Sequence, residues 1–376
     1  MRLDASRGPV SHRQRSEPTV ALVHDNFTGP TGMGRVLDSH ARFILESGWK
    51  LWIVGDNVPP DLRAAAERVT LVRNPRGLPK LLEHAEWCRH ARAAVRGAAA
   101  DIVHVHSPWL ALDADLQTSH FVSQAAFARD VREPGGGIEG ALRGVQAWVT
   151  RRADDRLYRR SRPATFLSFV SEFLRDEFRR HYGEPRGGWI FRPPAPGWRP
   201  PDAPQRARAR AALGVPEGSL AVGYLGGADP RKGFEHVLGL RSERDLHLLF
   251  AGPGSERVAV GDRPGLGFVD VDAFLSACDV LAAPSRFDSA PVVVLEAISR
   301  GVPVVTTPAS GWAGAIERHG CGAVWNDGGT PLANACRAAA AAAPRSCRAL
   351  IDEFEPRRER RVLIGAYERI LGRADR

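Results

Sequence analysis

The feature that most limits the fold of this chain is a pattern that occurs twice. Short, nearly continuous apolar runs end in Gly, Pro, Asp or Asn and are separated by longer stretches of helical periodicity. The runs are 19–26, 51–57, 69–75, 101–108 and 164–172 in the first series, and 220–227, 246–254, 279–285, 302–308 and 322–327 in the second. Such runs are typical of parallel strands covered by helices on both faces of a sheet. The pattern predicts two doubly wound α/β domains.

A proline-rich stretch separates the two series. Residues 192–205 hold six prolines, and proline has no backbone N–H to donate, so we expect a linker here rather than a strand or helix. The length of 376 residues also fits two domains. Ligands of such sheets bind beyond the carboxyl ends of the strands, so the two domains should face a central cleft. We predict a disordered basic tail (1–17), a first domain (18–195), a linker (196–211), a second domain (212–350) and a final helix (351–376) that packs back on the first domain.

Composition restricts the cellular compartment and the binding partners that we expect for this chain. No apolar stretch approaches the ~20 residues that span a bilayer, and the first residues lack the apolar middle of a secretion signal. The five cysteines form no CxxC pair, which favours reduced thiols over disulfides or a zinc site. We therefore expect a cytoplasmic protein. The formal charge of +9 would attract ligands that carry phosphate groups, or acidic lipid headgroups at a membrane surface. The arginine cluster at 151–163 is interleaved with acidic residues, which favours a solvated helix face over a binding patch.

Two carboxylates stand out in the stretch RFDSAPVVVLEAISRGVPVV (286–305). Asp288 precedes an apolar run, and Glu296 lies inside it. We expect a helix with Ser289 as its N-cap, an end near Arg300 and a stop at Gly301. A helix N-terminus at the carboxyl edge of a sheet suits a phosphate or a sugar hydroxyl. The spacing alone leaves a second interpretation open, in which Glu296 pairs with Arg300 on an exposed helix face and Asp288 is an ordinary loop carboxylate.

The same stretch resembles the signature of family 4 glycosyltransferases, in which two acidic residues separated by seven others precede a Gly-x-Pro-Val-Val strand. The resemblance extends over most of the chain, in the same order as in the family. It includes ALVHDNFTGPTGMGRVL, DIVHVHSPW, VSEFLRDEF, LGVPEGSLAVGYLGGADPRKGFEHVL, LLFAGPG and FLSACDVLAAPS. It implies the GT-B fold and a retaining transfer from a nucleoside-diphosphate sugar to an acceptor hydroxyl, without a metal or other cofactor.

The resemblance also implies roles for the residues that match its donor site. Glu296 would accept hydrogen bonds from the ribose hydroxyls, and Asp288 would hold the donor sugar near its anomeric carbon, although the family often has the longer Glu there. The backbone N–H groups of Ser289 and Ala290 would face the sugar and the diphosphate. Lys232, one of three lysines in the chain, would neutralise the leaving diphosphate.

Glycines complete the expected donor site. Gly32 and Gly34 are expected in a loop that lets the backbone approach the phosphates, and Gly226 and Gly227 follow the first strand of the second domain. The family often has arginine at the position of Gly227. One diphosphate contact is then missing unless Arg231 supplies it.

Histidines are among the site residues that we predict in the first domain. His104 and His106 point to one face of a strand, and with His120 they could hold a metal. Because the resemblance implies a metal-independent enzyme, we expect His106 or His120 to contact a sugar substrate, with burial against a backbone carbonyl as the alternative. We assign His106 to catalysis, and His120 and Arg35 to the acceptor.

The acceptor stays open at this point. Residues 121–163 combine a Gly-rich loop with an arginine-rich helix, which suits a cell-envelope glycan or glycolipid precursor at the membrane, or a soluble natural product such as an aminocyclitol. Two alternatives are a nucleotide-sugar epimerase on the same fold and a non-catalytic nucleotide-sugar binding protein. Nucleic acid is not expected, because no basic run has interleaved aromatic residues.

Overall fold

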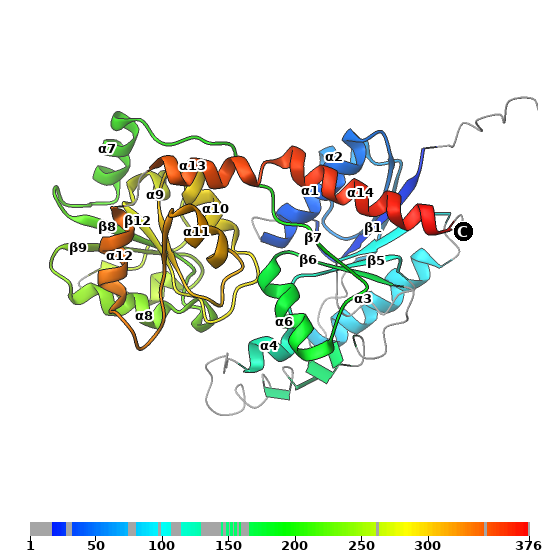
Figure 1. Ribbon diagram of the computed structural model, residues 1–376, viewed down its shortest axis with the longest axis horizontal. Coiled ribbons are helices and arrows are strands. Elements are labelled where there is room, and N and C mark those ends of the chain that lie inside the picture. Colours follow the sequence, from blue (N-terminus) through cyan, green and yellow to red (C-terminus); the bar gives the residue numbers. More distant parts are fainter. Residues whose placement is uncertain are drawn as a thin grey trace, which may run out of the picture.

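The protein is described by a computed structural model with two α/β domains, between which the chain crosses twice (Figure 1). The structure describes residues 17–27, 32–73, 80–96, 99–106, 114–128, 165–260, 263–341 and 344–374, and short pieces between 144 and 158. The predicted tail lies outside the described residues except for Glu17. So does most of the segment 121–163, to which the acceptor was assigned.

The first domain contains a parallel seven-stranded sheet in the order β3-β2-β1-β4-β5-β6-β7. Its strands are β1 (Thr19–His24), β2 (Lys50–Gly55), β3 (Arg68–Leu71), β4 (Ile102–Val105), β5 (Leu116–Ser119), β6 (Phe166–Phe169) and β7 (Gly187–Ile190). Its helices include α1 (Gly32–Glu46), α2 (Pro60–Ala65), α3 (Lys80–Val95), α4 (Ser123–Ala128) and α6 (Glu172–Tyr182). The strand order changes direction between the neighbours β1 and β4.

The second domain contains a parallel five-stranded sheet in the order β14-β13-β12-β8-β9. Its strands are β8 (Leu220–Leu225), β9 (Leu246–Ala251), β12 (Val280–Ala283), β13 (Val304–Thr306) and β14 (Gly322–Val324), with a small hairpin of β10 (Ala259–Val260) and β11 (Arg263–Pro264). Its helices include α7 (Ala203–Ala212), α8 (Phe234–Leu238), α9 (Val271–Ala277), α10 (Val292–Ser299), α11 (Ala313–His319) and α12 (Leu332–Ala340). Here the order changes direction between β8 and β12, so the sequence prediction of two doubly wound domains is confirmed.

Burial follows the two-sided cover that a parallel sheet needs. In β1 and β2 five consecutive residues are buried, because helices lie on both faces. Helix α1 instead buries one side, at spacings of three and four residues, and that side includes His40 among Leu37, Ala41 and Ile44. The apolar face of α1 therefore carries a polar ring into the core of the first domain.

The two crossings between the domains run next to each other. The first is the extended segment after β7, and the second lies between α13 (Pro344–Glu353) and α14 (Pro356–Ala374). The Ala195 N–H donates to the Phe354 carbonyl at 3.0 Å. Helix α14 then lies along the first domain (Figure 1), where Leu363 and Tyr367 enter the core, which confirms the predicted position of the final helix. No helix among the described residues is long and apolar enough to cross a bilayer.

Parts of the predicted organisation differ from the structure. Strands β5 and β7 were not predicted, because LQTS is polar and GGWI begins with two glycines. Residues 203–212 of the predicted linker form α7. A capping box between Asp202 and Gln205 starts this helix, and the helix packs on α9.

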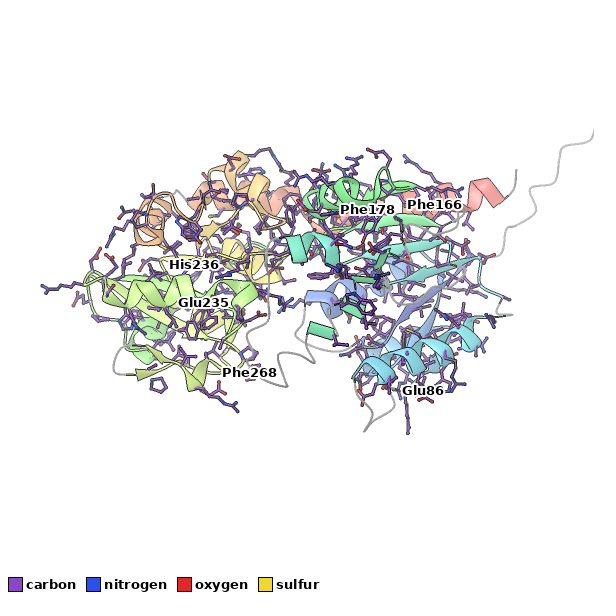
Figure 2. All side chains as sticks on the ribbon, turned by 90° about the horizontal axis from the view of Figure 1, so that it is seen from below. Glu86, Phe166, Phe178, Glu235, His236 and Phe268 are labelled. Atoms are coloured by element: carbon purple, nitrogen blue, oxygen red, sulfur yellow. The ribbon has the colours of Figure 1, made fainter. Side chains whose placement is uncertain are left out.

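Figure 2 shows the side chains on both domains, with Phe166 and Phe178 on the first and Glu235, His236 and Phe268 on the second.

Candidate active site

The switch points of the two sheets supply the walls of a cavity between the domains. In the second domain β8 leads to Lys232 and its neighbour β12 leads to Asp288. In the first domain β1 leads to Gly32, and β5, one strand beyond the switch point, leads to His120. A cavity of about 230 Å³ lies where these segments meet. Its lining includes Gly32, His120, Arg231, Lys232, Asp288 and Ser289. The structure thus brings together residues that the sequence analysis predicted for the donor and for the acceptor, although they lie far apart in the sequence.

A short 3₁₀ helix holds Lys232 at the cavity. The Asp229 carboxylate accepts from the Arg231 N–H at 2.9 Å and so caps the helix Pro230–Lys232. Gly233 follows with φ 71°, and a Cβ there would lie 2.1 Å from the Pro284 carbonyl oxygen, so only glycine fits this exit. The Lys232 ammonium pairs with the Asp288 carboxylate. The ion pair therefore joins the loops that follow β8 and β12.

Both domains hold the loop that carries Asp288. Within the second domain its N–H donates to the Ala309 carbonyl, and its own carbonyl accepts from the Gly311 N–H, both at 2.9 Å. The preceding residue, Phe287, packs against two rings of the first domain, with centroids 5.2 Å from Phe121 and 5.4 Å from Phe173. Phe287 was not predicted as a site residue. Its contacts make the position of Asp288 dependent on the approach of the two domains.

Helix α10 begins later than the sequence suggested. Its first residue is Val292, and Pro291 occupies the N-cap position without a side-chain hydrogen bond, so the prediction of Ser289 as N-cap is wrong. Instead, the Ser289 carbonyl accepts from the Ser171 hydroxyl of the first domain at 2.6 Å. Ser289 and Ala290 still line the cavity, just ahead of the helix N-terminus. Because proline has no N–H, Pro291 could not have donated to a Ser289 cap two residues before it.

Glu296 lies four residues into α10 and has 8% of its surface exposed. Its carboxylate pairs with Arg35, which comes from α1 of the first domain. Arg300 is buried as well and pairs with Asp272, not with Glu296. The interpretation of Glu296 and Arg300 as an exposed helix pair is therefore wrong. Glu296 takes part in a contact between the domains.

The predicted glycine loop is a helix start. Gly32 and Gly34 belong to the first turn of α1, and a Cβ on Gly32 would lie 3.0 Å from the Val292 side chain of α10. The missing side chain lets the two helices approach each other. The expectation of a loop at these two glycines is therefore wrong. Gly32 lines the cavity of about 230 Å³, whereas Gly34 lines a second cavity beside α1.

Backbone geometry explains Gly227. It has φ 65°, and a Cβ there would lie 2.2 Å from the Pro253 carbonyl oxygen. An arginine in this backbone conformation would collide with the loop after β9. A Cβ on Gly226 would likewise lie 2.4 Å from the Tyr224 hydroxyl. Arg231 lines the cavity, and its guanidinium donates to Asp229 at 2.8 Å.

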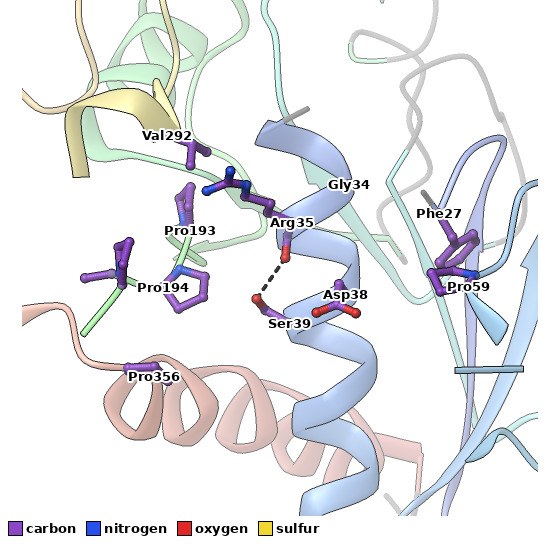
Figure 3. Close-up of a pocket in the computed structure, with 12 residues that line it drawn as sticks. Phe27, Gly34, Arg35, Asp38, Ser39, Pro59, Pro193, Pro194, Val292 and Pro356 are labelled. Atoms are coloured by element: carbon purple, nitrogen blue, oxygen red, sulfur yellow. Dashed lines mark hydrogen bonds between the residues drawn. The ribbon is translucent and has the colours of Figure 1, made fainter. Parts of the chain in front are cut away.

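A larger cavity of about 540 Å³ lies beside α1 on the side of the linker (Figure 3). Arg35, Asp38 and Ser39 supply its polar groups, and the Ser39 hydroxyl donates to the Arg35 carbonyl at 2.8 Å. Five prolines form much of the remaining wall: Pro59, Pro193, Pro194, Pro196 and Pro356. The two residues assigned to the acceptor therefore lie in different cavities, Arg35 in this one and His120 in the smaller one.

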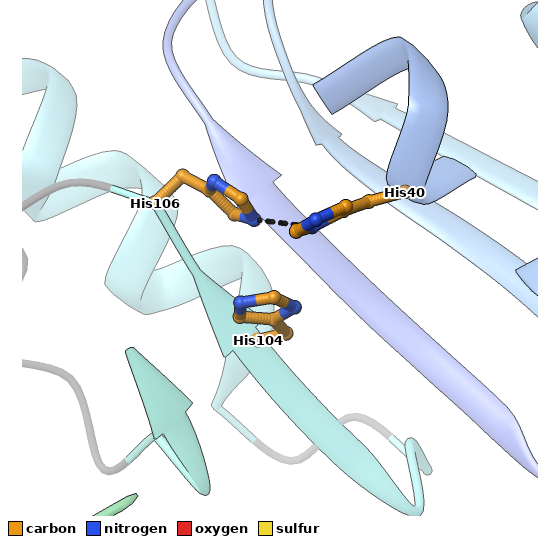
Figure 4. A group of neighbouring side chains, drawn as sticks. All are labelled: His40, His104 and His106. Carbon is orange, nitrogen blue, oxygen red and sulfur yellow. Dashed lines mark hydrogen bonds between the residues drawn. The ribbon is translucent and has the colours of Figure 1, made fainter. Parts of the chain in front are cut away.

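Four histidines meet in the core of the first domain, three of which are shown in Figure 4. His40 Nδ1 lies 3.2 Å from His106 Nε2, and His106 Nδ1 lies 2.9 Å from His120 Nε2. The ring of His104 bonds separately to the hydroxyls of Tyr367 and Thr118, both at 2.7 Å. His40 was missed, although a histidine on the apolar face of a helix pattern is a visible signal. His106 is fully buried behind His120, so it makes no direct contact with the cavity in this conformation.

Burial keeps these rings neutral. Desolvation lowers the pKa of His40 and of His120 to about 3 and lowers the pKa of His104 and of His106 well below the ordinary value. His40, His104 and His106 offer nitrogens within 4.8 Å of one another, a spacing that a metal could bridge. Both nitrogens of His104 and of His106 already have hydrogen-bond partners in the protein. The geometry therefore favours a hydrogen-bonded cluster over a metal site.

Comparisons with known proteins agree with this architecture. The family model "Glycosyltransferase Family 4" matches residues 30–188, and "Glycosyl transferases group 1" matches residues 221–342, which together are more than half of the chain. A protein of Mycolicibacterium smegmatis described as a GDP-mannose-dependent alpha-mannosyltransferase is 27% identical over 318 residues, 78% of this chain and 80% of that protein.

Solved structures show the same fold at low identity. The lipopolysaccharide glycosyltransferase WaaG is 20% identical, with TM-score 0.71 over 92% of this chain and 100% of its own. HepE from Anabaena, solved with UDP and glucose, is 14% identical, with TM-score 0.65 over 94% of this chain and 100% of its own. AviGT4, involved in avilamycin A biosynthesis, is 18% identical, with TM-score 0.57 over 94% and 98%. The chain belongs to the family 4 glycosyltransferases and has their GT-B fold.

Proposed function

We propose that this glycosyltransferase moves a sugar from a nucleoside-diphosphate sugar to an acceptor hydroxyl with retention of anomeric configuration and without a metal. The observation that carries the proposal is the Lys232–Asp288 ion pair at the switch point of the second sheet, beside the N-terminus of α10. A cation, a carboxylate and free helix N–H groups meet the three needs of a sugar diphosphate. These are compensation of its charge, a partner for the sugar hydroxyls, and donors for the phosphate oxygens.

The donor would exchange the internal ion pairs of the site for contacts of its own. Its diphosphate would attract Lys232, and the freed Asp288 carboxylate would accept from hydroxyls of the sugar. Ribose would compete with Arg35 for Glu296, because an ionised carboxylate accepts two hydrogen bonds and the Arg35 side chain is 41% exposed. The pairs keep the charges compensated before the donor arrives, which limits the cost of holding them in a partly closed cleft.

The transfer step needs no separate base in this proposal. The acceptor oxygen bonds to the anomeric carbon on the face from which the diphosphate departs, and the departing diphosphate takes the acceptor proton. Lys232 stabilises the charge that develops on the leaving group. Phe287, packed between Phe121 and Phe173, holds the Asp288 loop when the domains meet and helps to exclude water.

The acceptor belongs to the first-domain side, where His120 lines the smaller cavity and Arg35 the larger one. The two classes proposed are an envelope glycan or glycolipid precursor and a small natural product. WaaG is involved in lipopolysaccharide biosynthesis and AviGT4 in avilamycin A biosynthesis, so the shared fold occurs in both kinds of biosynthesis. For the envelope class we propose a site of action in the cytoplasm at the inner face of the membrane.

Thermal stabilisation by a panel of nucleoside diphosphates and their sugars, in EDTA, tests the donor site. The panel includes GDP-mannose and UDP-glucose, because the M. smegmatis relative is described as GDP-mannose-dependent and HepE was solved with UDP-glucose. A ligand at a hundred times its Kd adds about 2.7 kcal/mol to the free energy of unfolding. We expect one nucleotide to stabilise the wild type and Lys50→Ala, and to lose that effect in Glu296→Ala and Lys232→Ala. Lys50 is the matched control because it lies at the start of β2, away from the cavity.

Product analysis with the selected donor then separates the alternatives. A new glycoside that forms only with acceptor supports a transferase, and retention is read from the anomeric signals of the product. An altered sugar nucleotide without acceptor would instead identify an epimerase, and binding without any product would favour a binding protein. Equal stabilisation of wild type and Glu296→Ala would remove Glu296 from the donor site.

A further inference from the structure

Two buried histidines and the half-buried His120 form one hydrogen-bonded chain that ends at the cavity. His40 Nδ1 faces His106 Nε2 at 3.2 Å, and His106 Nδ1 faces His120 Nε2 at 2.9 Å. His40 has 2% of its surface exposed and His106 has none, whereas His120 is partly exposed and lines the cavity beside Lys232 and Asp288. The hydrogen bonds therefore connect His40 to the cavity through His106 and His120.

The chain restricts the tautomers of its members. A neutral imidazole has one N–H donor and one acceptor nitrogen. If His40 donates from Nδ1, His106 must accept at Nε2 and donate from Nδ1, and His120 then carries its proton on Nδ1. If His120 donates from Nε2, the same argument puts the proton of all three rings on Nε2. Any mixture leaves two hydrogens or two lone pairs facing each other in a dry core, which is costly.

We propose that His40 is a positioning residue, which acts through His106 to set the tautomer of His120 and so decides whether His120 Nδ1 offers a donor or an acceptor to a substrate hydroxyl. The role for the substrate rests on the proposed function, whereas the shared tautomer does not. A fixed tautomer would let the first-domain wall distinguish a hydroxyl by its orientation without placing a charge there.

The surroundings of the chain agree with neutral rings. Burial is the largest cause that lowers the pKa of His106 and of His120. The titratable groups that add to it are other histidines: His104, His40, His120 and His24 for His106, and His24 and His40 for His120. Tyr367 of α14 and Thr118 of β5 bond to His104 and not to the three-ring chain. His24 bonds to Asn26, and its ring lies 3.2 Å from the Asp25 carboxylate.

Nitrogen NMR of protein labelled with ¹⁵N-histidine tests the inference directly. Long-range ¹H–¹⁵N correlations report which ring nitrogen carries the proton, and single substitutions assign the signals among the 12 histidines. We expect His40, His106 and His120 to show the same tautomer in the wild type. His40→Phe keeps the ring contacts with Phe191 and His104 but removes Nδ1, and we expect His120 to become a mixture of tautomers.

Two further variants separate positioning from packing. His40→Asn places an amide near the former Nδ1, and, held in one orientation, that amide offers His106 either a donor or an acceptor, so His120 should again show a single tautomer. Tyr367→Phe removes a hydroxyl from the same cluster and should leave His120 unchanged. With an acceptor in hand, the acceptor KM should rise about tenfold in His40→Phe with donor binding unchanged, and should recover in His40→Asn where NMR shows the wild-type tautomer of His120. Different tautomers in the wild type, an unaltered His120 in His40→Phe, or a stoichiometric metal whose removal changes these signals would each overturn the proposal.

Discussion

The two walls of the cavity handle polarity in opposite ways. The second-domain wall carries Lys232 and Asp288 as charges that are paired with each other. The first-domain wall carries histidines that burial keeps neutral, of which His120 reaches the cavity. At the charged wall, a charged ligand can take the place of the internal partner of Lys232 or Asp288. A neutral wall offers a ligand only single hydrogen bonds. The difference matches a diphosphate-bearing donor on one side and an uncharged hydroxyl acceptor on the other.

Removal of the Lys232 cation should have the largest effect on the difference between the two walls. Lys232→Ala should lower kcat by about 10²–10³, because the loss of one group aimed at developing charge costs about 3–4 kcal/mol. Steady-state kinetics with the selected donor, with Lys50→Ala as the control, measures the effect. A kcat within a factor of two of the wild type would show that the charged wall does not serve the leaving group.

A second test concerns nucleotide binding by the same wall. Glu296→Ala should weaken nucleotide binding by about 10–100-fold, because hydrogen bonds to a charged group contribute about 1.5–3 kcal/mol. Calorimetric titration gives the Kd, and Glu317→Ala on α11 serves as a control at a helix outside both cavities. An unchanged Kd would mean that Glu296 does not bind the nucleotide and serves only the contact with Arg35 between the domains.

The neutral wall can be tested through acid stability. The pKa of His40 is about 3 in the folded protein and about 6.5 in the unfolded chain, so the unfolded chain takes up the proton first as the pH falls. Stability from His40 is complete above pH 6.5 and declines between pH 6.5 and 3, by up to ~1.4 kcal/mol per pH unit. Urea unfolding from pH 7.5 to 5 should show a shallower decline for His40→Phe. Equal slopes would mean that burial does not lower the pKa of His40 in the folded protein.

The smallest effect should come from the contact that joins the walls. Arg35→Ala removes the partner with which ribose competes for Glu296, so we expect the nucleotide Kd to fall a few-fold. The acceptor KM should rise if Arg35 also binds the acceptor, as the sequence predicted. The same titration and kinetics measure both values. A weaker nucleotide complex would instead place Arg35 on the donor.

The charged wall could be predicted from the sequence better than the neutral one. Lys232 and Asp288 lie in loops after strands that alternate with helices, and the topology of parallel sheets brings such loops to one edge. His40 and Phe287 depend on which faces pack together, and no local pattern fixes that. The start of α10 was misplaced because Ser289 is a good cap by composition, while its carbonyl is engaged by Ser171 across the cleft. Local chemistry predicted the donor loops, and tertiary contacts decided the rest.

The adjacency of the two crossings has a mechanical consequence. With Ala195 bonded to Phe354, the two crossings are held side by side, and such a double connection favours hinge motion about their common axis over twisting. Displacement grows with distance from that axis. The cavity of about 540 Å³ includes Pro196 and Pro356 from the crossings, so it should keep its shape when the domains separate. The contact of Phe287 with Phe121 should be lost early in that separation. Substrates would then enter at the far rim, and the prolines would set the angle at which the two walls meet.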